Sequence, residues 1–371
     1  MSIFHKDLTN INSFEKKEKQ RNYGIDSLRI LSMINIINLH IILRSGLLNI
    51  NSNKFKEVWL LETFSFFAVD CFGLISGIVG FDRYKFSNLI YLWFITTFYT
   101  VSVHLYLYMK KNINFKLLLL SFFPILNRSH WYVNAYFIIY LFLPFINFGI
   151  KLINKKTYKY LVLFYILFFS IYYVISAIFN KKNYNFLLDG FSSSWLTILY
   201  IIGSYFGKYI LKSMKQSSMI IKTLHFINYI GFSLLSCEIY FITKNKLLIN
   251  YLSPTILFQA ISLIMIFQSI KITNKFLIKI IKFITPLTFS ATLIHSKLFL
   301  LKISIVLFLF ESIKQFNSKF FFFKIYILSI IIFIFCILID YFRLLLFKRM
   351  RIREICLFLE TLFPKLIDRI L

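Results

Sequence analysis

Three ionisable side chains lie within one apolar stretch near the N-terminus, which reads IDSLRILSMINIINLHIIL from residue 25. They are Asp26, Arg29 and His40. At about 100° per residue, eleven positions bring Arg29 and His40 to one face of a helix, about 16 Å apart along its axis. Asp26 lies three positions before Arg29, so its carboxylate can hold the guanidinium in a fixed direction. A guanidinium can bind an anion and an imidazole can move a proton, so their shared face is consistent with a functional site as well as with a structural role.

Each of these residues also has an ordinary explanation. Arg29, near a helix end, can extend to a membrane interface, and a single histidine is more often a packing residue than a catalyst. Yet an ionisable side chain within a membrane span costs about 2.5 to 3.5 kcal/mol on insertion scales, so each requires a reason. For four other acidic residues in apolar stretches we expect structural pairing with neighbouring Lys or Arg: Glu62, Asp70, Glu238 and Asp340.

The elements that position these residues are membrane helices. The chain has 371 residues, of which 58% are hydrophobic and 20% aromatic, and a soluble fold cannot bury that much apolar surface. Apolar stretches of about 20 residues recur, and each can cross a hydrocarbon core of about 30 Å. We predict an all-α integral membrane protein with about ten transmembrane helices in one bundle. The expected spans are 25–43, 58–80, 86–109, 132–149, 160–179, 191–211, 220–243, 247–270, 283–301 and 320–346, whereas the apolar segment 117–126 is too short to span.

The formal net charge is +28, from 43 Lys and Arg against 15 Asp and Glu. These charges lie in short runs between apolar segments, as from Lys151 to Lys159, which orients membrane helices and argues against nucleic-acid binding. The side that holds the N-terminus collects more of the Lys and Arg residues, so we expect both termini in the cytoplasm and the protein in the plasma membrane. We expect a basic cytoplasmic segment at 1–24, a transmembrane domain at 25–346 and a basic amphipathic tail at 347–371 on the anionic inner leaflet.

The four cysteines lie in or beside apolar segments, and none forms a CxxC pair. This pattern predicts neither a disulfide framework nor a metal site, and we expect no bound cofactor. The first 21 residues are polar and charged, so the first membrane helix is expected to act as the insertion signal.

Four segments in order resemble the acyltransferase-3 family of multi-spanning membrane acyltransferases. The first carries Arg29 and His40 in an R-x10-H spacing. The second is FSFFAVDCFGLISGIVGF with a Ser-Gly pair at 76–77, and the fourth is ITPLTFSATLIHSKLF with its Ile-His pair at 294–295. The third is HWYVNAYFIIYLFLPFIN, a tryptophan-led span with Trp131 that closes with Pro144 and Asn147. The resemblance covers residues 23 to 300. The chain departs from the family pattern at Ile78, where a bulky aromatic is usual, and at 292–293, where Thr-Leu replaces Tyr-Leu.

The resemblance implies transfer of an acyl group, commonly acetyl from acetyl-CoA, to a hydroxyl of a cell-envelope polysaccharide or glycolipid. His40 would be the general base, Arg29 would position the acyl-CoA donor, and Asp26 would support Arg29. The expected substrate-binding residues are Ser76, Trp131, Tyr132 and His295. A secondary transporter or flippase for a glycan or lipid precursor is the alternative, although no internal repeat is visible. A catalytically inactive relative that serves as a membrane scaffold is a third.

Overall fold

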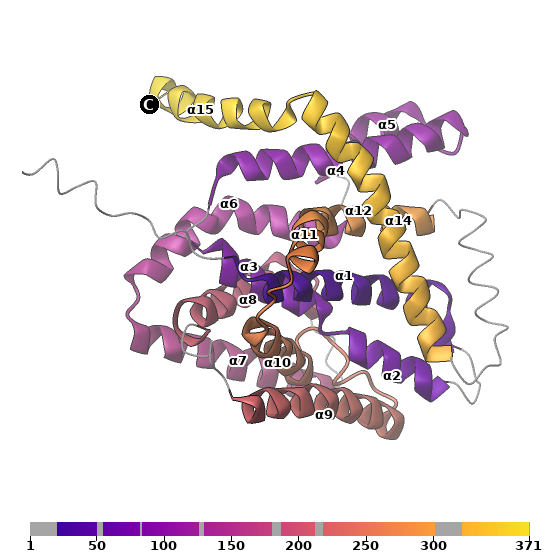
Figure 1. Cartoon of the computed structure of the whole chain (residues 1–371), viewed down its shortest axis with the longest axis vertical. Helices are drawn as coiled ribbons and strands as arrows, with labels where there is room; N and C mark the ends of the chain where they lie inside the picture. The colour runs from indigo at the N-terminus through magenta and orange to yellow at the C-terminus, as the bar shows by residue number, and fades with distance from the viewer. Residues whose placement is uncertain are drawn as a thin grey trace, which may run out of the picture.

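The computed structural model describes residues 21–49, 55–81, 84–125, 130–179, 187–211, 218–300 and 321–370. Every regular element in these ranges is a helix (Figure 1), which confirms the predicted all-α fold. Within these ranges eight helical stretches are long and apolar enough to cross a membrane. They are Tyr23–Arg44, Lys56–Gly80, Phe86–Met109, Trp131–Leu152, Lys155–Ser176, Met219–Thr243, Lys275–Ser296 and Phe321–Arg349.

The two remaining expected spans form shorter helices. The stretch 191–211 contains α8 (Ser193–Tyr205), of 13 residues, continued by a π-helical turn, η4 (Phe206–Ile210), of 5 residues. The stretch 247–270 contains α10 (Pro254–Ser269), of 16 residues. A hydrocarbon core of about 30 Å takes about 20 helical residues, so the expected count of ten spans is not confirmed.

Helix α1 (Tyr23–Arg44) occupies the middle of the bundle. It contacts α2 (Phe55–Ser65), α3 (Ala68–Gly80), α10, α12 (Thr288–Leu300) and α14 (Phe321–Arg349) (Figure 1). Asn22 caps its N-terminus, since the side-chain oxygen accepts from the Ile25 amide. Further along, the Asn38 amide donates to Ser65 at 2.7 Å, and Ser329 donates to Asn38 at 3.2 Å. These bonds tie α1 to α2 and α14 on a side that differs from the one bearing Arg29 and His40.

Glycines allow α3 and α8 to pack with their backbones nearly in contact. A Cβ on Gly77 would lie 2.1 Å from the Tyr200 carbonyl oxygen, and one on Gly203 would lie 2.0 Å from the Leu74 carbonyl oxygen. Only glycine fits these positions, as in other tightly packed membrane helix pairs. The Ser-Gly pair singled out in the sequence therefore fixes the position of α3, which carries Ser76 and Asp70.

Two expected spans are interrupted. The span 58–80 is divided into α2 and α3 at a turn of Phe66 and Phe67. The span 283–301 begins at the end of α11 (Lys275–Ile284), passes through a 3-10 turn, η5 (Thr285–Leu287), and continues in α12. Pro286 lies in that turn, and because proline has no amide hydrogen it breaks the helix there. This 3-10 turn lies about two turns of helix before His295.

The remaining helices surround this centre: α4 (Phe86–Met109), α5 (Phe115–Leu120), α6 (Trp131–Leu152), α7 (Lys155–Ile178), α9 (Met219–Thr243) and α15 (Ile352–Ile370). The apolar segment near 117 gives only the six-residue α5, so it does not span. Within the predicted tail, α15 follows a left-handed residue, Arg351, and packs beside α4 (Figure 1). Arg353 donates to Asn88 at 2.6 Å, and Ile352 and Cys356 are buried.

Candidate active site

The Arg29 end of the site is a carboxylate shared by two guanidinium groups. Asp26 accepts from Arg29 Nη1 at 3.4 Å, as the sequence predicts, and from Arg21 Nε at 2.5 Å. Asp26 is buried, whereas the Arg29 side chain is 25% exposed. Two positive groups on one carboxylate leave a net positive charge at this end of α1, which suits an anionic ligand.

At the other end of the same face, His40 meets His295 of α12. His40 Nδ1 lies 2.7 Å from His295 Nε2, and the ring centroids are 4.8 Å apart. His295 is fully buried and His40 is half-buried. The sequence predicts that His295 binds substrate, and the structure brings His295 into direct contact with His40, the expected base.

The hydrogen bonds of His295 assign protons to both rings. Its Nδ1 lies 2.5 Å from the Ala291 carbonyl oxygen, which can only accept, so Nδ1 carries the hydrogen. In neutral His295 the other nitrogen, Nε2, is then an acceptor, and His40 Nδ1–H donates to it. This leaves the lone pair of His40 on Nε2. That atom is free to take a proton from a substrate hydroxyl.

The N-terminal part of α6 lies beside both ends of this face. At the histidine end, His130 Nδ1 is 3.3 Å from Ser296 Oγ, and Ser296 directly follows His295. At the arginine end, the hydroxyls of Tyr132 and Tyr136 are close enough to Arg29 to interact with it electrostatically. Helix α6 therefore forms a wall that extends from the histidine pair to the guanidinium.

Ser76 of α3 lies at the arginine end of this wall. Its hydroxyl donates to the Phe72 carbonyl at 2.8 Å and is close enough to the Tyr136 hydroxyl to interact with it. Tyr136 and Tyr132 stack with their ring centroids 6.3 Å apart. The predicted residues Ser76 and Tyr132 are thus connected through Tyr136, and both lie near Arg29.

Trp131 faces a different group of residues. Its ring contacts Phe191 at 4.8 Å and Tyr251 at 6.3 Å between centroids, and Phe191 and Tyr251 are 5.1 Å apart. Phe66 lies against Tyr251 at 4.7 Å. We call these four residues, Phe66, Trp131, Phe191 and Tyr251, the aromatic cluster. Trp131 is joined to the candidate site through its neighbours His130 and Tyr132.

Two of the four acidic residues expected in structural pairs form ion pairs. Asp340 and Arg343, both buried, are 2.7 Å apart, and Asp340 also accepts from Tyr99 of α4. Glu238 pairs with Lys56 at 2.7 Å. Asp70 does not pair with Lys or Arg in the described ranges: its Oδ1 accepts from Trp195 Nε1 at 3.2 Å.

The prediction that Asp70 pairs with Lys or Arg is therefore wrong. Its partner is the indole of Trp195, which lies 125 positions further along the chain. Its second oxygen, Oδ2, has no hydrogen-bond partner within the described part of the chain. Glu62 Oε2 is likewise without one, although Lys246 acts on Glu62 electrostatically. Buried oxygens of this kind are uncommon in native proteins and require an explanation.

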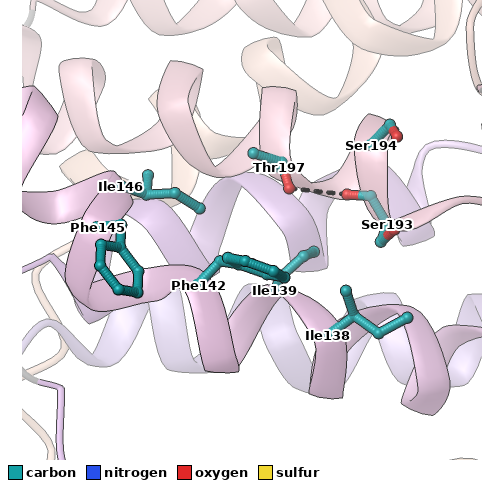
Figure 2. Close-up of a pocket in the computed structure, with 8 residues that line it drawn as sticks. All are labelled: Ile138, Ile139, Phe142, Phe145, Ile146, Ser193, Ser194 and Thr197. Atoms are coloured by element: carbon teal, nitrogen blue, oxygen red, sulfur yellow. Dashed lines mark hydrogen bonds between the residues drawn. The ribbon is translucent and has the colours of Figure 1, made fainter.

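A cavity of about 340 Å³ lies between α6 and α8 (Figure 2). Its lining is mostly apolar, with three hydroxyls on the α8 side: Ile138, Ile139, Phe142, Phe145, Ile146, Ser193, Ser194 and Thr197. Thr197 donates to the Ser193 carbonyl at 2.8 Å, so this hydroxyl is used within α8. None of the predicted site residues lines this cavity. Its exposed phenylalanines suit contact with lipid chains.

The site residues that come from distant helices are not predicted from the sequence. Tyr136 follows Tyr132 by one helical turn, a spacing that could have indicated it. No pattern in the sequence pointed to Ser296 or Asp70 as neighbours of the site. Both became recognisable only from the packing of α3, α6 and α12.

Comparison with protein families matches residues 22–341 to the family model described as an acyltransferase domain, that of acyltransferase-3. Comparison with the curated proteins and with the solved structures found no match.

Proposed function

Since this chain belongs to the acyltransferase-3 family and is a membrane acyltransferase, we propose that it moves an acetyl group from acetyl-CoA to a hydroxyl of a cell-envelope glycan. The observation that carries this proposal is the face of α1 that bears an anion-binding guanidinium and a histidine pair, about 16 Å apart along the helix. The two ends suit the two substrates of such a transfer.

The donor binds at the Arg29 end. The phosphates of acyl-CoA are anionic, and Arg29 together with Arg21 supplies two guanidinium groups against the single carboxylate of Asp26. Asp26 fixes the direction of Arg29, which matters because a guanidinium binds oxyanions with defined geometry. The Tyr132 and Tyr136 hydroxyls beside Arg29 support the same ligand.

His40 acts as the general base at the other end. The acceptor hydroxyl gives its proton to His40 Nε2 while its oxygen forms a bond to the thioester carbonyl carbon. The tetrahedral intermediate then collapses, the carbon–sulfur bond breaks, and the CoA thiolate takes the proton back from His40. The products are the acyl ester and CoA with its thiol, so atoms and charges balance without a bound cofactor.

His295 is the positioning residue for this base. By accepting from His40 Nδ1 it fixes the orientation of the ring and directs the lone pair of Nε2 toward the substrate. The hydrogen bond from His295 to Ala291 holds His295 itself in place. As in a catalytic triad, a second group orients the histidine base.

We place the protein in the plasma membrane with both termini in the cytoplasm. In this orientation the Arg29 end of α1 is nearer the cytoplasm, where acyl-CoA is made, and the His40 end lies in the outer half of the bilayer. Donor and acceptor then approach from opposite sides.

The test in cells is to express wild type, His40→Ala and Arg29→Ala in matched amounts and to measure acetyl esters on envelope glycans by mass spectrometry. Loss of the ester in both variants supports the proposal. Unchanged esters with stable His40→Ala protein would instead favour a transporter.

A further inference from the structure

The aromatic cluster is built from four separate parts of the chain. Phe66 comes from the turn between α2 and α3, Trp131 begins α6, Phe191 precedes α8, and Tyr251 lies in the loop before α10. Their ring centroids are 4.7 to 6.3 Å apart in the contacts described above. Four chain segments that meet through aromatic rings form a surface that is apolar but can also bind the faces of other rings.

A turn in an unusual conformation holds Phe191 over this cluster. Leu188, Asp189 and Gly190 have φ values of 46°, 54° and 88°, so three consecutive residues are left-handed and two of them are not glycine. Leu188 and Asp189 are strained in this conformation because they carry side chains, so the surrounding contacts must hold them. Gly190 packs so closely on Tyr251 that a Cβ there would lie 2.4 Å from the Tyr251 Cβ. The Phe191 side chain remains 46% exposed, which leaves it accessible to a ligand.

The second observation is the carboxyl group of Asp70 beside the cluster. Asp70 is fully buried, and Trp195 Nε1 binds only one of its oxygens. It is close enough to interact electrostatically with both Tyr251 and Tyr132, so it lies between the cluster and the Arg29 end of the site. Oδ2 has no hydrogen-bond partner in the described ranges, and a buried polar oxygen without a partner destabilises the protein. A ligand hydroxyl would remove this destabilisation.

We propose that the aromatic cluster and Asp70 form the acceptor subsite, in which a pyranose ring lies against Phe191 and Trp131 while one of its hydroxyls donates to Asp70 Oδ2. A sugar combines an apolar face of C–H groups with hydroxyl donors, which matches aromatic rings next to a free carboxyl oxygen. The subsite adjoins the base, because Trp131 follows His130, and His130 contacts the residue after His295. This inference rests on the proposed function for the identity of the acceptor.

The test measures sugar binding separately from transfer. His40→Ala protein in lipid nanodiscs is titrated with hexyl glucoside, hexyl galactoside, hexyl mannoside and hexyl N-acetylglucosaminide. Tryptophan fluorescence is recorded, because Trp131 lies in the subsite and Trp195 hydrogen-bonds Asp70. Hexan-1-ol, which carries the same alkyl chain without the sugar, is the reference. We expect saturable quenching by at least one pyranoside and none by hexan-1-ol.

Variants in the same background locate the binding. We expect Phe191→Ala and Asp70→Asn to raise the Kd at least tenfold, about 1.4 kcal/mol, and Phe191→Trp to restore it. Phe164→Ala is the matched control, since Phe164 is 54% exposed on α7 outside the cluster. If Asp70→Asn fails to fold, Phe191→Ala still tests the subsite. The Phe191 ring is half exposed, so its removal should leave the protein folded.

Two outcomes would contradict the proposed subsite. Either none of the four pyranosides gives saturable quenching, or Phe191→Ala and Phe164→Ala have equal Kd values. Failure of the proposed function looks different. In that case wild type transfers no acetyl group from acetyl-CoA, whether or not the pyranosides bind.

Discussion

His40 and His295 are 255 positions apart in the chain, yet their ring nitrogens Nδ1 and Nε2 lie 2.7 Å apart in the centre of the bundle. The hydrogen bond from His295 to the Ala291 carbonyl makes His295 the acceptor and His40 the donor. A base that is held in this way keeps its remaining lone pair in one direction. The predictions below follow from this relationship and from the helices that maintain it.

Replacement of His295 tests its positioning role. We expect His295→Ala to lower kcat for acetyl transfer by about tenfold to a hundredfold, because His40 then loses its orienting acceptor. The KM for acetyl-CoA should stay within about twofold, since Arg29 and Asp26 are untouched. His295→Gln offers a side-chain acceptor and should recover part of kcat. A rise in KM with unchanged kcat would show that His295 binds substrate instead.

Replacement of Arg29 by lysine tests donor binding. Lysine keeps the charge but cannot form two parallel hydrogen bonds, so we expect the KM for acetyl-CoA to rise about tenfold. The measurement is initial rate against acetyl-CoA concentration at fixed acceptor. Lys56→Arg is the matched control, since Lys56 pairs with Glu238 at an exposed position. An unchanged KM in Arg29→Lys would contradict a donor role.

The close packing of α3 on α8 predicts a loss of stability in Gly77→Val. Its Cβ would overlap the Tyr200 carbonyl oxygen, and such overpacking costs about 1 to 3 kcal/mol. Thermal unfolding in nanodiscs measures the effect. Gly231→Ala in α9 has no atom within 4 Å of the added Cβ and should be neutral or stabilising. Equal melting temperatures for Gly77→Val and wild type would disprove the helix contact.

The buried pair of Asp340 and Arg343 predicts a large effect of Asp340→Ala. Removing the carboxylate leaves the Arg343 guanidinium, which is 2% exposed, without its counter-ion, at a cost of about 3 to 5 kcal/mol. By contrast, Glu354→Ala breaks an exposed pair with Arg351 and should cost less than about 1 kcal/mol. Chemical denaturation measures the free energy of unfolding of both variants. Similar losses in Asp340→Ala and Glu354→Ala would contradict the buried position of the Asp340–Arg343 pair.

Single cysteines can decide whether α8 crosses the membrane. The four native cysteines are buried, so a new exposed thiol should be the one that reacts with an impermeant maleimide. With ten spans and a cytoplasmic N-terminus, Asn112→Cys reacts in intact cells, whereas Met219→Cys and Lys271→Cys react only after permeabilisation. Labelling of Met219→Cys from outside would mean that α8 does not cross.

Helical periodicity was sufficient to predict the shared face of Arg29 and His40, because the two residues belong to one unbroken helix. The all-α fold was equally predictable, since apolar stretches of about 20 residues have few alternatives in lipid. The interruptions were harder to find. The turn at Phe66 and Phe67 contains no Gly or Pro, and nothing in its composition distinguishes it from the apolar residues on either side.

The partners of the site residues could not be predicted for a different reason. The contacts from His40 to His295 and from Asp70 to Trp195 depend on how α1, α3, α8 and α12 rotate against one another. Apolar sequences give little information on rotation when lipid and helix neighbours are equally hydrophobic. The sequence therefore predicts that Asp70 pairs with Lys or Arg. In the folded bundle its partner is the indole of Trp195.

The central claim is that His40 removes a proton from the acceptor hydroxyl. The direct measurement is transfer of labelled acetyl from acetyl-CoA to hexyl pyranosides by purified protein in nanodiscs, with wild type and His40→Ala compared at equal amounts of folded protein. We predict a loss of kcat of about 100-fold to 10,000-fold in His40→Ala, with CoA binding unchanged. Transfer by His40→Ala at the wild-type rate would contradict the mechanism.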